Sequence, residues 1–205
     1  LASPFLPIGV GIFSYFGAAQ YMMNVFGADK GGFRALLLLP TERWKYLAAK
    51  NIAFLPLSLG ISLLYFLLAC LIHPPTSVSF TMGLMVMGQV YLMFSTFGNF
   101  MSLYFPFRLE TSGKARRSRV SRNLQAALFS MLASVISLLP SAFCMAFDPV
   151  LRLLLGYEGI ALGPSISVLT FILLAALYYL CLKSAGRVFQ KREYAILDEL
   201  IRDTE

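Results

Sequence analysis

The side chains that most often perform chemistry are sparse in this sequence. Three cysteines, Cys70, Cys144 and Cys181, stand in or beside apolar runs without CxxC spacing, which is typical of buried apolar side chains rather than of metal ligands or disulfides. The single histidine, His73, stands beside two prolines, and we interpret it as an interfacial side chain. The acidic residues are isolated or crowded at the C-terminus. The sequence therefore predicts no catalytic residue, cofactor or metal site.

The missing motifs also weigh against several function classes. No GxxxxGK[ST] motif occurs, so a P-loop cannot hydrolyse ATP in this chain. An ion-coupled carrier or channel would need an ionisable group inside a span, and the apolar runs contain none. A membrane-embedded enzyme of lipid metabolism would need clustered Asp, Glu or His near the membrane surface. That enzyme, and a structural or assembly membrane protein without transport, remain the alternatives.

One charged segment, residues 24–50 (NVFGADKGGFRALLLLPTERWKYLAAK), interrupts the apolar sequence. Its three glycines in GADKGG predict a break, and FRALLLLP predicts a short helix that ends near Pro40. Thr41 is then expected to cap a second helix, with Glu42 in its first turn where the helix dipole favours an acid. Trp44 and Tyr46 suit an aromatic belt at a membrane surface. The segment is either a docking element for a cytoplasmic partner or an amphipathic interfacial loop.

The elements that position this segment are membrane spans. Only 13% of the residues are charged and the mean hydropathy is +0.73, whereas a soluble domain has about 25% charged residues. The apolar runs lack period-2 alternation and are long enough for helical spans of about 20 residues. We predict an all-α polytopic protein in which residues 1–205 form a single transmembrane domain. The five predicted spans cover residues 3–26, 52–72, 78–104, 124–146 and 164–184.

The sequence begins with Leu, already inside an apolar run. We therefore expect a further span upstream, which would make six in the full chain.

The basic residues predict the orientation of the spans. Sixteen of the 17 Lys and Arg residues fall in the segments 27–50, 106–123 and 183–205, which five spans place on one side. The positive-inside rule assigns that side to the cytoplasm. Because these residues are juxtamembrane, the net charge of +7 predicts contact with lipid headgroups rather than with nucleic acid. The predicted cytoplasmic parts are the loops 27–51 and 105–123 and the tail 185–205.

Three further segments have alternative interpretations. The basic stretch from Arg108 to Asn123 either sets topology or makes a second contact with a cytoplasmic protein. On the outer side, VLRLLLGY (residues 150–157) is predicted to form a short re-entrant or interfacial helix, either a gate or a lid. The tail is predicted to be an amphipathic helix, with an apolar stripe of Val188, Tyr194, Leu197 and Ile201.

Three stretches of the sequence, residues 24–53, 98–110 and 189–200, resemble parts of a known family, the ABC-2 type transporter permeases. NVFGADKGGFRALLLLPTERWKYLAAKNIA resembles their cytoplasmic loop between the second and third helices, and GNFMSLYFPFRLE is similar to the end of the fourth helix in a bacterial subset. The C-terminal FQKREYAILDEL also looks like the tail of such proteins. In the first segment the match is carried by Phe26, Gly27, Asp29, Gly32, Phe33, Leu39, Pro40, Arg43, Lys50 and Asn51. In the second it is carried by Gly98, Asn99, Ser102, Phe105, Pro106 and Arg108.

The resemblance implies a function and a set of partners. A subunit of six helices would pair into a homodimer or heterodimer in the bacterial cytoplasmic membrane. The loop after the second helix would carry a coupling helix that docks on a separate ABC ATPase, which holds the ATP and Mg²⁺. The chain would then be the permease of an exporter, for a drug, lipid, polysaccharide or peptide. The implied ATPase contacts are Asp29, Phe33, Arg34, Pro40, Glu42 and Arg43.

Polar residues inside the predicted spans are the remaining candidates. Most are expected to form hydrogen bonds between helices, and a few would line a route for the substrate. The candidates for this translocation path are Gln89, Ser95, Thr96, Asn99 and Gln125.

Overall fold

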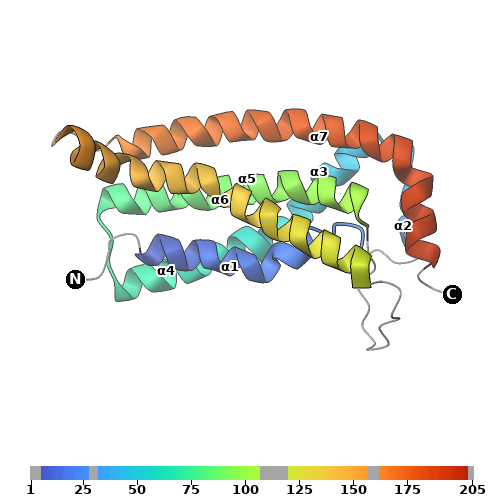
Figure 1. Cartoon of the computed structure of the whole chain (residues 1–205), viewed down its shortest axis with the longest axis horizontal. Helices are drawn as coiled ribbons and strands as arrows, with labels where there is room; N and C mark the ends of the chain where they lie inside the picture. The colour runs from blue at the N-terminus through green and yellow to red at the C-terminus, as the bar shows by residue number, and fades with distance from the viewer. Residues whose placement is uncertain (1–5, 28–31, 107–119, 157–161, 203–205) are drawn as a thin grey trace.

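The computed structural model describes residues 6–27, 32–106, 120–156 and 162–202, and nearly all of them are helical (Figure 1). No strand occurs within these ranges, so the prediction of an all-α protein is confirmed. The elements are α1 (Leu6–Met22), α2 (Gly32–Leu37), α3 (Arg43–Leu55), the π-helical turn η1 (Pro56–Gly60), α4 (Ile61–Ile72), α5 (Ser77–Tyr104), α6 (Val120–Leu155) and α7 (Gly163–Arg202).

Four helical segments in the described part of the chain are long and apolar enough to cross a membrane. Their outward faces expose many large apolar side chains, as a lipid environment requires. Within the described residues, the first predicted span, 3–26, is helical from Leu6 to Met22. These 17 residues have a length of about 25 Å, against a hydrocarbon core of about 30 Å, and residues 3–5 lie outside the described part. The four segments are Arg43–Ile72, Ser77–Tyr104, Leu128–Leu155 and Gly163–Asp198.

The helices run back and forth along one long axis (Figure 1). One end of the bundle holds α2, the start of α3, the end of α5, the start of α6 and the C-terminal part of α7. The opposite end holds the start of α1, the turn between α4 and α5, and the end of α6. The described parts of the three basic segments therefore lie at the same end, which we call the basic end.

The second span begins earlier than the predicted 52–72. Its helix starts at Arg43 and continues through α3, η1 and α4 to Ile72. The predicted cap is also wrong, because Glu42 occupies the N-cap position in an extended conformation and makes no capping side-chain bond. The polar half of α3 is helical because it packs on another helix, with Leu47 and Asn51 buried.

The fourth span ends later than the predicted 124–146. Although α6 contains Pro140 and Pro149, it continues to Leu155, so VLRLLLGY does not form a separate helix over its described residues. A proline removes one backbone hydrogen bond and bends a helix without always ending it, and α6 changes direction along its length (Figure 1). The helix stops at Gly156, whose φ of 60° is favourable for glycine.

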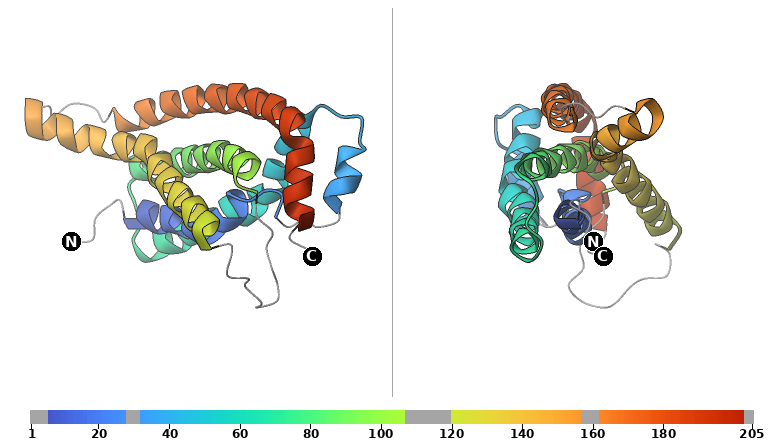
Figure 2. Two further views of the ribbon diagram at one scale, coloured as in Figure 1. Left: turned by 45° about the vertical axis from the view of Figure 1, so that its right-hand side comes forward. Right: turned by 90° about the vertical axis from the view of Figure 1, so that its left-hand side faces the viewer.

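The last span and the tail form one continuous helix, α7. The predicted boundary at residue 184 therefore does not separate two elements. Beyond the bundle, the C-terminal part of α7 turns across the basic end and lies beside α2 (Figure 2). This turn brings the tail against the loop that precedes α3.

Two apolar clusters divide the interior. One lies between the spans and includes Phe66, Met87 and Phe94. The other lies at the basic end and includes Phe26, Phe33 and Phe189. The second cluster packs the described part of residues 24–50, the segment that resembles the family's cytoplasmic loop, against the bundle.

Candidate functional site

The short helix α2 lies at the basic end, beside the C-terminal part of α7 and on the far side of it from the bundle (Figure 2). Its phenylalanine, Phe33, is fully buried. The Phe33 ring packs edge-on against Phe26 with centroids 5.3 Å apart, and it stacks on Phe189 of α7 at 6.0 Å. Phe26 also stacks on Tyr46 of α3 at 6.2 Å. We call Phe26, Phe33, Tyr46 and Phe189 the loop–tail cluster.

The loop–tail cluster joins four elements that are distant in sequence. Phe26 and Phe189, whose rings are 4.9 Å apart, come from the turn that follows α1 and from α7. Aromatic pairs of this kind each contribute about 0.5–1.5 kcal/mol beyond the burial of their surface. The cluster therefore fixes α2 to the tail and to the start of α3.

Arg43, the first residue of α3, ties the same elements together by hydrogen bonds. Its Nε donates to Glu193 Oε2 of α7 at 2.9 Å, and the two side chains are only 16% and 15% exposed. Its Nη2 donates to the carbonyl oxygen of Leu37, the last residue of α2, at 3.0 Å. The final carbonyls of a helix have no partner within the helix, so Arg43 closes α2 while it pairs with the tail.

The turn between α2 and α3 is exposed at its tip. Leu38 is 84% exposed and Leu39 is 48% exposed, and Pro40, Thr41 and Glu42 are exposed as well. We call residues 38–42 the tip. It presents two leucines, a proline and a carboxylate on a base that is packed against the bundle.

The carboxylate of Glu42 is held by its neighbours on α3. Lys45 Nζ lies 2.9 Å from Glu42 Oε2, and Trp44 Nε1 donates to the same oxygen at 3.0 Å. The hydrogen bond from Lys45, and then the positive charge of Lys45, lower the pKa of Glu42 below its ordinary value. Glu42 is therefore ionised at neutral pH and presents a negative charge at the edge of the tip.

The six predicted ATPase contacts are thus divided by the structure. Pro40 and Glu42 are exposed on the tip. Phe33 is interior and Arg43 is mostly buried, so both hold the tip rather than present a surface. Asp29 and the side chain of Arg34 lie outside the described residues.

Asn51, another residue that carries the family resemblance, forms hydrogen bonds to two other spans. Its Nδ2 donates to the Tyr178 hydroxyl of α7 at 2.8 Å, and its backbone carbonyl accepts from the Tyr91 hydroxyl of α5 at 2.6 Å. The point where the chain enters the membrane is therefore fixed to two other helices.

Gly98 and Ser102, from the second family-like segment, lie against the chain that leaves α1. The Ser102 hydroxyl accepts from the backbone N–H of Val25 at 2.7 Å and donates to the Gly98 carbonyl at 2.7 Å. A side chain at Gly98 would overlap the carbonyl oxygen of Met22. This contact positions the residues that lead into α2.

The predicted path residues lie on α5 and α6, and those whose side chains are described are buried or half-buried. Gln89 is fully buried; its Nε2 donates to the Ser167 carbonyl of α7 at 2.8 Å, and its Oε1 accepts from Ser141 of α6 at 3.4 Å. Ser95 and Asn99 are buried, and Thr96 donates to the Leu92 carbonyl within α5. The side chain of Gln125 lies outside the described residues.

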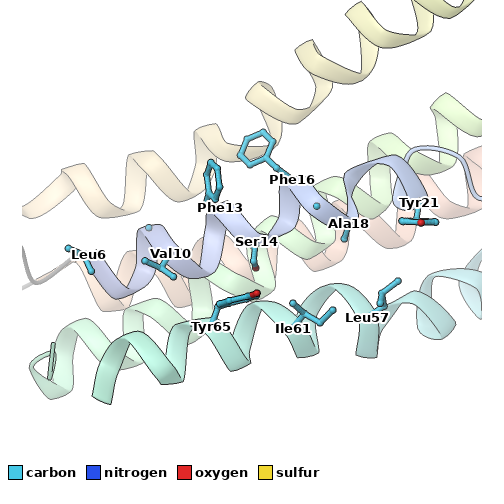
Figure 3. A pocket seen from close by; sticks show the side chains of 12 residues that line it. Leu6, Val10, Phe13, Ser14, Phe16, Ala18, Tyr21, Leu57, Ile61 and Tyr65 are labelled. Atoms are coloured by element: carbon cyan, nitrogen blue, oxygen red, sulfur yellow. The ribbon is translucent and has the colours of Figure 1, made fainter. Parts of the chain in front are cut away.

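A large apolar groove lies elsewhere, between α1 and α4 (Figure 3). It has a volume of about 900 Å³, which is within the range of ligand pockets. Phe13 and Phe16 of α1 lie above it and Ile61 and Tyr65 of α4 lie below it in Figure 3. Among the described path candidates, none lines this groove.

Sequence reasoning missed Glu193 and Phe189, the two tail residues that hold α2 and α3. The predicted apolar stripe of the tail included Tyr194 but neither Phe189 nor Ile196. In the structure Tyr194 is 78% exposed, whereas Phe189 and Ile196 are buried. Phe189 and Ile196 are seven residues apart, so a helical stripe through Phe189 could have been found. The pairing of Glu193 with Arg43, 150 residues away, has no local signal.

In the part of the chain that the structure describes, no group of three His, Cys, Asp or Glu residues gathers. Comparison with known proteins found no match: no family model, no curated protein and no solved structure aligns with the chain.

Proposed function

We propose that this chain is the permease subunit of an ABC-2 type exporter, driven by ATP that a separate ATPase subunit hydrolyses. The observation that carries the proposal is the exposed tip at residues 38–42, mounted on α2 and fixed to α3 and α7. A docking element of this kind has to be exposed where it binds and rigidly connected where it transmits force. The resemblance of this loop to the family supports the same assignment.

Force applied to the tip has two routes into the spans. The first is the helix that begins at Arg43 and continues without interruption to Ile72. The second passes through Arg43, Glu193 and the loop–tail cluster into α7. A movement of the tip would therefore displace two spans together.

The assembly we propose has two permease subunits, identical or homologous, and two ATPases on the cytoplasmic side. ATP and Mg²⁺ bind to the ATPases. Their closure on ATP moves the two tips, and the helix bundles then open outward and release the substrate. The basic end faces the cytoplasm, and the membrane is the bacterial cytoplasmic membrane. Within this chain no residue performs covalent chemistry.

The test is co-purification of a P-loop ATPase with the tagged full-length protein in mild detergent. We expect Leu38→Ala combined with Glu42→Lys to reduce the amount of ATPase recovered at least about tenfold, as loss of interface hot spots does. Leu153→Ala is the matched control, because Leu153 is also a leucine that is 84% exposed but lies near the opposite end. This control should recover the ATPase in full.

Absence of any co-purifying ATPase would remove the energy source from the proposal. Equal loss of the ATPase in the Leu38 variant and the Leu153 control would show that the tip is not the contact. The first result would favour a structural or assembly protein. Each variant is accepted only if it elutes as a single species in size exclusion.

A further inference from the structure

Two lysines lie over two aromatic rings where α3 contacts α7. Lys45 Nζ is 5.7 Å from the centre of the Trp44 ring, and Lys183 Nζ is 4.7 Å from the centre of the Tyr179 ring. The two rings meet edge to face with centroids 6.4 Å apart. We call Trp44, Lys45, Tyr179 and Lys183 the Trp44 patch.

The backbone holds the Trp44 patch in place. A Cβ added at Gly186 would lie 2.6 Å from Trp44 Cβ and 2.7 Å from Trp44 N, so α7 contacts the backbone of α3 at this point. The Trp44 ring is fixed further by its hydrogen bond to Glu42. The two lysines are therefore presented by a rigid junction.

The charge at the patch is positive. Glu42 is the carboxylate that binds Lys45, and its charge also lies near that of Lys183. Arg187 is exposed one turn beyond Lys183. The patch and the next turn of α7 therefore carry three cations, Lys45, Lys183 and Arg187, against the single carboxylate of Glu42.

The patch lies at the level of lipid headgroups. The α7 helix carries no charge from Gly163 to Leu182, a length of about 30 Å that matches the hydrocarbon core. Lys183 is the first charge after this run. Directly below it, Tyr179 is 48% exposed and Leu180 is 64% exposed. The surface thus changes from cationic to apolar within one turn.

We propose that the Trp44 patch binds an anionic phospholipid, with the lipid phosphate between Lys45 and Lys183 and an acyl chain along the exposed face of Leu180. The lysine ammonium groups, the two aromatic rings and the adjoining exposed apolar surface match the charged, interfacial and apolar parts of such a molecule. A free phosphate would not need the apolar strip, and an acidic protein surface would not need a site at the membrane boundary. The proposal is independent of the proposed ATPase.

Trp44 is the only tryptophan in the sequence, which also has ten tyrosines, so fluorescence excited selectively from tryptophan reports on the patch alone. The full-length protein is reconstituted in nanodiscs of phosphatidylcholine that contain increasing amounts of phosphatidylglycerol with brominated acyl chains. Brominated phosphatidylcholine in otherwise identical discs gives the reference quenching. We expect the anionic lipid to quench with an apparent affinity about fivefold or more above that of the neutral lipid, the factor expected for one lysine near the surface.

Lys45→Gln combined with Lys183→Gln should bring this ratio to about one, the value without electrostatic selectivity. Replacing both lysines by arginine should retain most of it, because the positive charges remain. Arg152→Gln, which removes an exposed cation near the opposite end, is the control and should leave the ratio unchanged.

Three results would overturn the proposal. One is equal quenching by the anionic and neutral lipids in the unaltered protein. Another is relief of quenching by inorganic phosphate at constant ionic strength, which would assign the patch to free phosphate. The third is a lack of lipid selectivity together with binding of polyglutamate that the double glutamine variant loses, which would assign the patch to an acidic protein surface.

Discussion

Gly98 lies where α5 packs closely against the end of α1, next to the backbone of Met22 and Met23. The approach brings Ser102, one turn later, within hydrogen-bond distance of Val25. Both residues belong to a segment that resembles the permease family, and in the structure they position the chain that leads from α1 into α2. A single methyl group at Gly98 has no space, because backbone atoms occupy the position.

We expect Gly98→Ala to lower the free energy of unfolding by about 1–3 kcal/mol, the usual cost of overpacking, or to prevent folding. The measurement is the thermal midpoint in detergent, followed by Trp44 fluorescence. Gly17→Ala is the matched control, because nothing lies within 4 Å of an added Cβ there, and a helical alanine is favoured over glycine by up to about 1 kcal/mol. Equal thermal midpoints for the two variants would contradict the packing described for Gly98.

At the scale of elements, the connection between α2, α3 and α7 depends on Arg43. Its partly buried pairing with Glu193 differs from that of the nearby pair Lys45–Glu42, whose side chains are 57% and 63% exposed. Exposed pairs contribute little to stability because water screens them. The two pairs therefore offer a comparison within one region.

A double-mutant cycle with Arg43→Gln and Glu193→Gln should give a coupling energy of about 1 kcal/mol. Arg43→Gln should lower the free energy of unfolding more than Glu193→Gln does, because it also removes the hydrogen bond to the Leu37 carbonyl. Unfolding in denaturant, followed by Trp44 fluorescence, supplies the four free energies. The same cycle on Lys45 and Glu42 should give no measurable coupling, and a larger coupling there than at Arg43 would refute this ranking.

Sequence predicted the elements better than their ends. Charge-free runs located the spans because burial in lipid requires a long apolar stretch. The ends were missed where a tertiary contact stabilised a helix against its local signal. Arg43 begins a helix that packs on α7, and α6 continues through Pro149 while Asp148 accepts hydrogen bonds from the backbone N–H of Leu162 and Gly163.

The candidate site was predicted only in part for the same reason. The exposed residues Pro40 and Glu42 could be placed from the local pattern of glycine, proline and charge. The burial of Phe33 depends on Phe189, and the role of Arg43 depends on Glu193. Both partners lie more than 140 residues further along the chain, beyond the reach of any periodicity.

At the scale of the whole molecule, the structure places the tip and the turn between α4 and α5 at opposite ends of the bundle (Figure 1). The positive-inside rule then assigns them to opposite sides of the membrane. Thr41 and Pro74 are exposed representatives of the two ends.

The predicted location of the two ends on opposite sides of the membrane is tested by labelling with a membrane-impermeant thiol reagent. Cys70, Cys144 and Cys181 are first replaced by alanine. A cysteine at Thr41→Cys should react in inside-out vesicles and be protected in right-side-out vesicles. A cysteine at Pro74→Cys should show the reverse. Labelling of both from the same side would disprove the arrangement of the spans.

The π-helical turn η1 sets the angular phase of the second span. In a regular α-helix Asn51 and Ser62 would project within about 20° of each other, because eleven residues make about three turns. The extra residue of a π-helical turn rotates one half by about 100°. Asn51 binds Tyr178 of α7, whereas the Ser62 hydroxyl donates to the Gly11 carbonyl of α1. The number of residues between Pro56 and Gly60 is therefore constrained more tightly than their identity, since losing one would turn an entire half-helix away from its neighbour.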